Sequence, residues 1–254
     1  MYKNFDLSGK VALVTGGAGD LGSAIAIGLS QAGADMAIAD LKLDTYPEIE
    51  KKIKAEGRAC MSAQVDVTSE KSVAEAVAAV MKKYGKIDIL VCAHGIAIRK
   101  PADTFPVEEW QKVMDVNSRG VFICCQAVGR IMIAQKYGKI VNLSSVRGEY
   151  GLPANYVAYS PSKAAVNLIT KDLACEWAKK GITVNAIAPT VIESALTKAA
   201  LADPAWGIAM KARIPMGRFG VTDDLVGPVI FFSSKASEFV TGQILYIDGG
   251  VTTC

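Results

Sequence analysis

Two tyrosines stand close together in the stretch NYVAYSPSK, residues 155–163, and either phenol could exchange a proton with a substrate. Tyr159 precedes Lys163 by four residues, so on a helix their side chains lie one turn apart on the same face. At that spacing Tyr156 meets only Ser160, which offers no charge. A free phenol has a pKa near ~10, and a neighbouring ammonium favours the phenolate, so Lys163 is expected to lower the pKa of Tyr159 by about one to three units. Tyr159 and Lys163 are therefore a candidate acid/base couple.

Two further polar residues could support this chemistry. Ser145 ends an apolar run, and a hydroxyl there can hold a substrate oxygen. Asn117 lies among valines in an expected helix, where an amide needs a hydrogen-bond partner such as a water or a backbone carbonyl. The only histidine is His94, and neither H-E-x-x-H nor G-x-S-x-G occurs. These absences argue against a zinc site and a hydrolase nucleophile elbow, so we expect no metal, and we interpret His94 as a packed, hydrogen-bonded side chain.

A glycine-rich turn, TGGAGDLG at 15–22, follows the first apolar run and precedes a helical stretch. Glycines in such a turn let the backbone approach a pyrophosphate at the helix N-terminus. Asp20 would repel phosphate, so we expect its side chain to point away, with capping of the helix as one possible role. Asp40 ends the second apolar run, where a carboxylate accepts ribose hydroxyls and repels a 2′-phosphate. No Arg or Lys directly follows it, so the predicted cofactor is NAD rather than NADP.

Seven short apolar runs alternate with longer amphipathic stretches along the chain. The runs span 10–16, 34–40, 59–67, 86–95, 138–145, 182–189 and 242–250. This alternation predicts an α/β fold with a doubly wound, seven-stranded parallel sheet between two layers of helices. The stretch 69–85 has helical spacing, with Ser69 as its cap and Gly85 as its end. We expect residues 1–254 to form one dinucleotide-binding catalytic domain, with a substrate lid at the irregular stretch 191–221.

The overall composition narrows the class of protein. The 254 residues carry 28 basic and 25 acidic side chains, a net charge of +3, so no nucleic-acid or membrane-surface partner is indicated. None of the six cysteines forms a C-x-x-C pair, and we interpret all six as buried thiols in a reducing compartment. No leader-like apolar region or membrane span is present, so the expectation is a soluble, cytoplasmic protein.

Nine motifs, taken in order, resemble the short-chain dehydrogenase/reductase family in its single-domain form over essentially the whole chain. They are TGGAGDLG at 15–22, Asp40, DV at 66–67, CAHG at 92–95, VNSRG at 116–120, LSS at 143–145, YSPSK at 159–163, VNAIAP at 184–189 and DGG at 248–250. The resemblance implies a Rossmann-type fold and a catalytic tetrad of Asn117, Ser145, Tyr159 and Lys163. In that tetrad Tyr159 is the acid/base, and Lys163 lowers its pKa and binds the nicotinamide ribose. Ser145 orients the substrate, and Asn117 holds a water in a proton relay.

The same resemblance implies where the cofactor binds. The implied contacts are Gly16, Gly19, Asp20, Leu21, Gly22, Asp40, Asp66, Val67, Gly95, Tyr159, Lys163, Pro189, Ile192 and Ser194. Among these, Asp66 and Val67 would flank the adenine, and Ile192 and Ser194 would meet the nicotinamide carboxamide. Family members are usually homotetramers that pack long helices together, here the stretches 106–134 and 156–180.

The expected reaction is hydride transfer between NAD and a secondary alcohol of the polyol, sugar or sugar-acid type. The C-terminal DGGVTTC resembles that of polyol and sugar-acid members, and polar residues follow Ser145. Candidate substrate contacts are Arg147, Asn155, Tyr156 and Trp206. Two alternatives remain open: a 3-oxoacyl reductase-like enzyme, and a catalytically silent NAD-binding protein.

Overall fold

The computed structural model describes residues 2–152, 154–194, 197 and 204–253. Its centre is a sheet of seven parallel strands in the order β3-β2-β1-β4-β5-β6-β7. The strands are β1 Val11–Thr15, β2 Asp35–Asp40, β3 Cys60–Gln64, β4 Ile89–Cys92, β5 Gly138–Leu143, β6 Ile182–Pro189 and β7 Ile244–Ile247. Each strand lies within one of the seven apolar runs, so the predicted sheet is confirmed.

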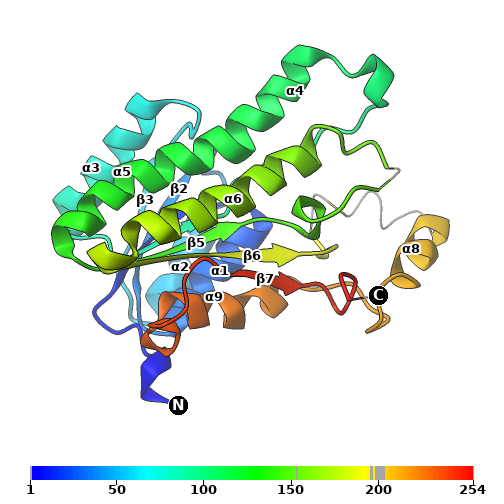
Figure 1. Ribbon diagram of the computed structural model, residues 1–254. Helices are drawn as coiled ribbons and strands as arrows, with labels where there is room; N and C mark the ends of the chain where they lie inside the picture. Colours follow the sequence, from blue (N-terminus) through cyan, green and yellow to red (C-terminus); the bar gives the residue numbers. More distant parts are fainter. Residues whose placement is uncertain (1, 153, 195–196, 198–203, 254) are drawn as a thin grey trace.

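Helices cover both faces of the sheet (Figure 1). They are α1 Asp20–Gln31, α2 Tyr46–Ala55, α3 Glu70–Tyr84, α4 Val107–Met114, α5 Gly120–Gln135, α6 Tyr159–Trp177, α8 Pro204–Lys211 and α9 Val226–Ser233. Helices α3, α5 and α6 enclose one hydrophobic core against the sheet, and α1, α2 and α9 enclose the other. Central strands buried on both faces explain why the sequence shows continuous apolar runs there instead of alternation.

The predicted ends of helix α3 are confirmed. The Ser69 hydroxyl accepts a hydrogen bond from the Ser72 N–H at 3.2 Å, which satisfies one of the unpaired donors at the helix start. Gly85 takes the left-handed conformation at the other end, with φ of 73°. Local sequence signals therefore fix this helix before any tertiary contact is considered.

Strand order reverses at β1, which lies between β2 and β4. Thr15 pairs in register with Ala39 on β2 and with Cys92 on β4, so these three strands end at one edge of the sheet. Ligands of open α/β sheets bind outside the carboxyl ends of the strands at such a reversal. The glycine turn, Asp40 and His94 all follow strand ends at this edge.

The cysteine prediction is wrong at one position. Cys60, Cys92, Cys124 and Cys125 are buried free thiols, as expected, but Cys175 is exposed on α6. The spacing of Cys175 places it on the solvent side of an amphipathic helix, where its neighbour Glu176 is also exposed. Cys254 lies outside the described residues.

Within the part of the chain that the structure describes, no helix has the length and apolar character needed to cross a membrane.

The irregular stretch 191–221 is joined at its two ends. Ile192 forms a parallel bridge with Gly220, with Glu193 N–H donating to the Gly220 carbonyl at 2.8 Å and Gly220 N–H donating to the Val191 carbonyl at 3.0 Å. Helix α8 lies between these ends, and positions 195–196 and 198–203 fall outside the described residues. The two ends therefore leave and rejoin the body of the protein at one point.

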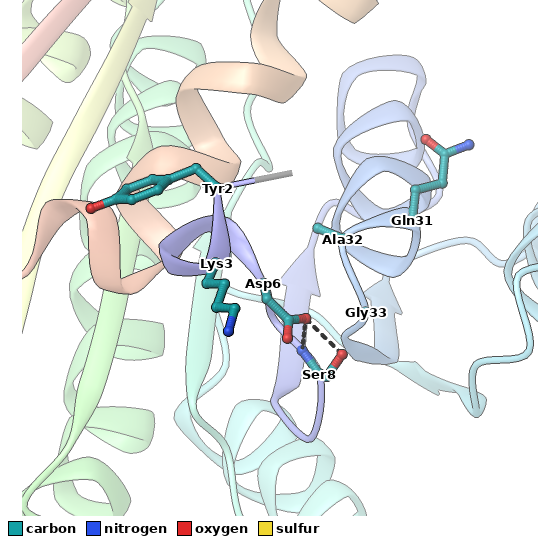
Figure 2. Close-up of a pocket in the computed structure, with 7 residues that line it drawn as sticks. All are labelled: Tyr2, Lys3, Asp6, Ser8, Gln31, Ala32 and Gly33. Atoms are coloured by element: carbon teal, nitrogen blue, oxygen red, sulfur yellow. Dashed lines mark hydrogen bonds between the residues drawn. The ribbon is translucent and has the colours of Figure 1, made fainter.

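A cavity of about 320 Å³ lies beside the N-terminal segment (Figure 2). Its wall includes Asp6, whose carboxylate accepts hydrogen bonds from the backbone N–H and the hydroxyl of Ser8 at 2.9 and 2.6 Å. Ser8 and Gly33 precede β1 and β2, which places this cavity at the amino edge of the sheet.

Candidate active site

Helix α6 begins at Tyr159, so Tyr159 and Lys163 occupy its first turns as predicted, while Tyr156 precedes the helix. The Lys163 Nζ lies 5.7 Å from the centroid of the Tyr159 ring. Lys163 is almost fully buried, and its ammonium donates to the Leu143 carbonyl at 2.7 Å. Because Leu143 ends β5, this bond fixes the lysine at the carboxyl edge of the sheet.

Ser145 follows β5 and lies beside Tyr159. Its hydroxyl donates to the Pro189 carbonyl at 3.4 Å and accepts from the Arg147 N–H at 3.2 Å. A hydrogen bond between Ser145 and Tyr159 also influences the phenol. The structure thus brings together the serine, the tyrosine and the lysine that the sequence singled out.

Asn117 lies in a π-helical turn, Asp115–Arg119, that joins α4 to α5. Its side chain is fully buried. The amide accepts from the Ile96 N–H at 2.8 Å and donates to the Ile96 carbonyl and to the Ser162 hydroxyl, both at 2.9 Å. The expectation that a buried amide here needs partners is confirmed, and the Ser162 partner is one that the sequence did not reveal. π-Helical turns of this kind are frequent at functional sites.

The expectation that the protein lowers the pKa of Tyr159 is wrong. Burial raises the pKa of this phenol above its ordinary value, and the hydrogen bond with Ser145 and the charges of Arg147 and Arg99 oppose that rise without cancelling it. Desolvation penalises the phenolate more than these groups favour it. The phenol therefore remains protonated at neutral pH in the protein's own field, and is suited to donate a proton.

Burial has the opposite effect on the two neighbouring bases. It lowers the pKa of Lys163 to about 8, so the amine still carries its proton at neutral pH. Burial and the charge of Lys163 lower the pKa of His94 to about 3, so the imidazole is neutral. Because the His94 imidazole is neutral, the buried ammonium of Lys163 has no second positive charge beside it from His94.

His94 is packed and hydrogen-bonded, as interpreted from the sequence. Its Nδ1 lies 2.8 Å from the Thr15 hydroxyl, while Nε2 is buried and has no hydrogen-bond partner within the described residues. A Cβ placed on Gly120 would come within 3.3 Å of that Nε2 and 3.0 Å of Val67. His94 therefore joins the end of β1 to the start of α5.

The glycine turn is closely packed against its neighbours. A Cβ on Gly16 would lie 2.5 Å from the His94 backbone nitrogen, and a Cβ on Gly22 would lie 2.1 Å from the Gly16 carbonyl oxygen. Gly16 also has a φ of 70°, which favours glycine. Gly19 is the N-cap of α1 and makes no side-chain bond, so Asp20 is the first residue of the helix and does not occupy its cap position. Leu21 follows it inside α1. A dinucleotide pyrophosphate fits such a turn at a helix N-terminus.

Asp40 holds the glycine turn in place from the end of β2. Its carboxylate accepts the Ala18 N–H at 3.0 Å and the Lys42 N–H at 3.4 Å. The Lys42 side chain is exposed two positions beyond Asp40. Asp40 therefore has a structural task in addition to any contact with a ribose.

Other expected cofactor contacts lie at the same edge. Asp66 accepts both the N–H and the hydroxyl of Thr68, and these bonds lower its pKa below the ordinary value. Gly95 packs directly against the tetrad, since a Cβ there would lie 3.4 Å from both Asn117 Oδ1 and Lys163 Nζ. The end of β4 therefore brings the chain next to two of the four tetrad residues.

The last three expected contacts follow β6, where the chain enters the stretch 191–221. Pro189 ends β6 and Ile192 forms the bridge to Gly220. The Ser194 N–H donates to the Thr197 hydroxyl at 3.0 Å. Ile192 and Ser194 therefore come shortly after Pro189, whose carbonyl accepts the hydrogen bond from the Ser145 hydroxyl.

The four expected substrate contacts have different positions. Arg147 and Tyr156 lie next to the tetrad: the Tyr156 ring is 5.8 Å from that of Tyr159, and the Arg147 guanidinium is 5.4 Å from the Tyr156 ring. Asn155 is exposed in a turn with φ of 61°. Trp206 stacks on Phe219 within the stretch 191–221, at 6.2 Å between ring centroids.

One neighbour of Tyr156 was missed from the sequence. The Arg99 guanidinium lies 4.9 Å from the centroid of the Tyr156 ring, so two arginines, Arg99 and Arg147, contact the same ring. Arg99 stands only four residues after Gly95 at the end of β4, and that position at a strand end was the available signal.

Comparisons with known proteins agree with this geometry. A family model described as enoyl-(acyl carrier protein) reductase matches residues 16–252. The chain is 38% identical to gluconate 5-dehydrogenase of Gluconobacter oxydans (strain 621H), covering 98% of this chain and 96% of the relative. It is 41% identical to an NAD-dependent glycerol dehydrogenase of Listeria innocua, with the same coverage. A crystal structure of a gluconate 5-dehydrogenase from Burkholderia cenocepacia in complex with NADP and tartrate superimposes with a TM-score of 0.95 at 38% identity, covering 99% of this chain and 98% of that one.

Proposed function

The chain belongs to the short-chain dehydrogenase/reductase family, and from that membership we propose that it transfers a hydride between a nicotinamide dinucleotide and a secondary alcohol of a polyhydroxylated substrate. The observation that carries the proposal is the meeting of Ser145, Tyr159 and Lys163 at the carboxyl edge of the sheet, next to Gly95. Polyols and sugar acids are favoured as substrates because the similar relatives are gluconate and glycerol dehydrogenases.

Each tetrad residue is assigned one task. In ketone reduction the Tyr159 phenol, which its raised pKa keeps protonated, donates its proton to the substrate oxygen. The Ser145 hydroxyl orients that oxygen. Lys163, held by the Leu143 carbonyl, supplies a positive charge beneath the phenol and a donor for the nicotinamide ribose. Asn117 holds a water in the proton relay. The dinucleotide supplies the hydride when it is bound.

Cofactor binding is assigned to the carboxyl edge of the sheet. The pyrophosphate would lie on the glycine turn, formed by Gly16, Gly19, Asp20, Leu21 and Gly22, and the adenine between Asp66 and Val67. Asp40 favours NAD, because its carboxylate repels a 2′-phosphate. The remaining contacts are assigned to Gly95, Pro189, Ile192 and Ser194.

The stretch 191–221 is assigned the role of a substrate lid on this one domain. Its ends are paired at Ile192 and Gly220, so the segment is attached to the rest of the protein at one point. Arg147, Asn155, Tyr156 and Trp206 are assigned to the substrate side. Phe122 on α5 and Leu168 on α6 are exposed apolar side chains on the two helices expected to form subunit contacts, which supports a homotetramer.

The deciding experiment measures cofactor reduction with a panel of polyols, sugar acids and hydroxy-steroids, and cofactor oxidation with 3-oxoacyl thioesters. Wild type is expected to be active on the polyhydroxylated group, and Tyr159→Phe to lose activity by about 10²- to 10⁴-fold while still binding the dinucleotide. Tyr156→Phe is the matched control and retains proton transfer. Activity only on the thioesters would favour a 3-oxoacyl reductase. Dinucleotide binding with no turnover by either protein would favour a silent binding protein.

A further inference from the structure

Arg147 is a buried cation with an unpaired donor. Its side chain is nine-tenths buried, and its Nη1 has no hydrogen-bond partner within the described residues. Charged side chains are rarely buried in this way unless they are paired. Burial lowers the pKa of Arg147, but a guanidinium does not lose its proton in proteins, so the charge stays.

The guanidinium lies beside the serine and the tyrosine of the proposed site. Arg147 belongs to the short turn Val146–Gly148 that follows Ser145, and its own N–H donates to the Ser145 hydroxyl. The guanidinium carbon is 5.2 Å from the Tyr150 ring centroid and 5.4 Å from that of Tyr156. These rings and the backbone bond hold the cation near Tyr159, whose pKa its charge lowers.

Two other arginines lie near Arg147. The Arg99 guanidinium carbon is 4.9 Å from the centroid of the Tyr156 ring, and Arg213 is close enough for its charge to lower the pKa of Arg147. The ion pairs among the described residues include none of these three arginines. The nearby carboxylate of Glu149 instead accepts the Tyr246 hydroxyl at 2.7 Å. Within the described part of the chain, Arg99, Arg147 and Arg213 therefore carry positive charge without an ion-pair partner.

We propose that Arg147 binds the carboxylate of the substrate, so that this enzyme acts on polyhydroxylated acids in preference to neutral polyols. The inference rests on the proposed function and adds a specificity-determining residue to it. A carboxylate accepts the free Nη1–H and is held at a fixed distance from Ser145, because the same turn carries both residues. A neutral polyol leaves the buried donor unpaired, and a site built for a hydrogen-bonded group rejects a ligand that lacks it.

The test compares gluconate with glucitol, which has a hydroxymethyl group in place of the carboxylate. For wild type we expect kcat/KM to be about 100-fold higher with gluconate. Arg147→Gln is expected to lose most of that difference, because KM for gluconate rises far more than KM for glucitol. Arg147→Lys keeps the charge and is expected to recover part of the loss. Arg58→Gln is the matched control, since Arg58 is half-buried at the amino edge and donates to the Gly33 carbonyl at 3.0 Å.

Equal losses on both compounds, or a wild-type preference for glucitol, would overturn the carboxylate assignment while leaving the proposed reaction intact. Turnover of neither compound would instead be a failure of the proposed function. In that case calorimetric titration of gluconate into wild type and Arg147→Gln, each with the dinucleotide present, still decides the assignment. Binding that does not depend on Arg147 would reject it. Thermal unfolding of both variants shows whether a lost signal comes from a misfolded protein.

Discussion

Asn117 and Ile96 are joined by two reciprocal hydrogen bonds: the Ile96 N–H donates to Oδ1 at 2.8 Å, and Nδ2 donates to the Ile96 carbonyl at 2.9 Å. One side chain thus satisfies both backbone groups of a residue in the loop after β4. The π-helical turn orients Asn117 toward that loop, and Ser162 on α6 accepts the remaining donor. The Asn117 amide therefore joins the loop after β4, the π-helical turn and helix α6.

Replacing this amide should destabilise the fold. Asn117→Ala leaves the backbone groups of Ile96 without their partner, so we expect the free energy of unfolding to fall by about 2–4 kcal/mol. Ser118→Ala is the matched control in the same turn, because the Ser118 hydroxyl bonds only within its own helix, to the Met114 carbonyl. Its expected cost is below about 1 kcal/mol. Denaturant unfolding of both variants checks the difference, and equal stabilities would contradict it.

Lys163 should cost stability at neutral pH. Its folded pKa of about 8 lies below the ordinary 10.5, so between these values the unfolded chain binds more protons and stability rises with pH. Relative to Lys163→Met, wild type is therefore expected to gain on the order of 3 kcal/mol of stability between pH 7 and pH 10.5, while the variant loses activity. Most of this gain should come as the pH rises from 8 to 10.5. Lys171→Met, an exposed position on the same helix, should show neither effect. Denaturant unfolding across this pH range distinguishes them, and a pH-independent difference would argue against the shifted pKa.

Asp40 should control the choice between NAD and NADP. Asp40→Asn keeps an acceptor for the Ala18 N–H but removes the charge that repels a 2′-phosphate. We expect the ratio of kcat/KM for NAD over NADP to fall by at least about tenfold. Asp35→Asn is the control at the other end of β2, where the carboxylate accepts the Ala59 N–H. An unchanged ratio in steady-state assays would remove the basis for assigning NAD.

The Arg218–Asp224 ion pair should affect substrate binding more than stability. Two bonds of 2.7 and 2.9 Å link the guanidinium to the carboxylate, which also accepts the Val221 N–H. These bonds lower the pKa of Asp224 to about 2, so the pair persists across the physiological range. Because the pair is partly exposed, Asp224→Asn should cost under about 1 kcal/mol.

The same variant should raise the KM for the alcohol and leave kcat nearly unchanged, since Asp224 holds the end of the stretch 191–221 through Arg218 and the Val221 N–H. Its exposed neighbour offers the comparison: Asp223→Asn should behave like wild type in both assays. A fall in kcat without a change in KM would exclude the assigned role in substrate binding.

Much of the architecture could be predicted from the sequence because its signals are local. The seven buried runs predicted the strands, and the spacing of Tyr159 and Lys163 predicted their shared helix face, since four residues make one turn. The need for a partner at Asn117 also followed from its apolar neighbours. The partner itself did not, because Ile96 lies 21 residues away and pairs through its backbone.

Electrostatic properties of the site were not predictable in the same way. The sign of the Tyr159 pKa shift depends on how completely the phenol is buried, which the spacing to Lys163 does not reveal. The burial of Arg147 was likewise hidden, because a charged residue in a loop is usually exposed. Whether a charged group is solvated depends on contacts that come from several segments at once.

The bridge between Ile192 and Gly220 brings the two ends of the stretch 191–221 together. Because the intervening segment starts and finishes at neighbouring points, its length and sequence can vary without moving β6, α9 or the phenol–amine couple. A change confined to this segment can therefore leave the sheet and the position of Tyr159 and Lys163 as they are.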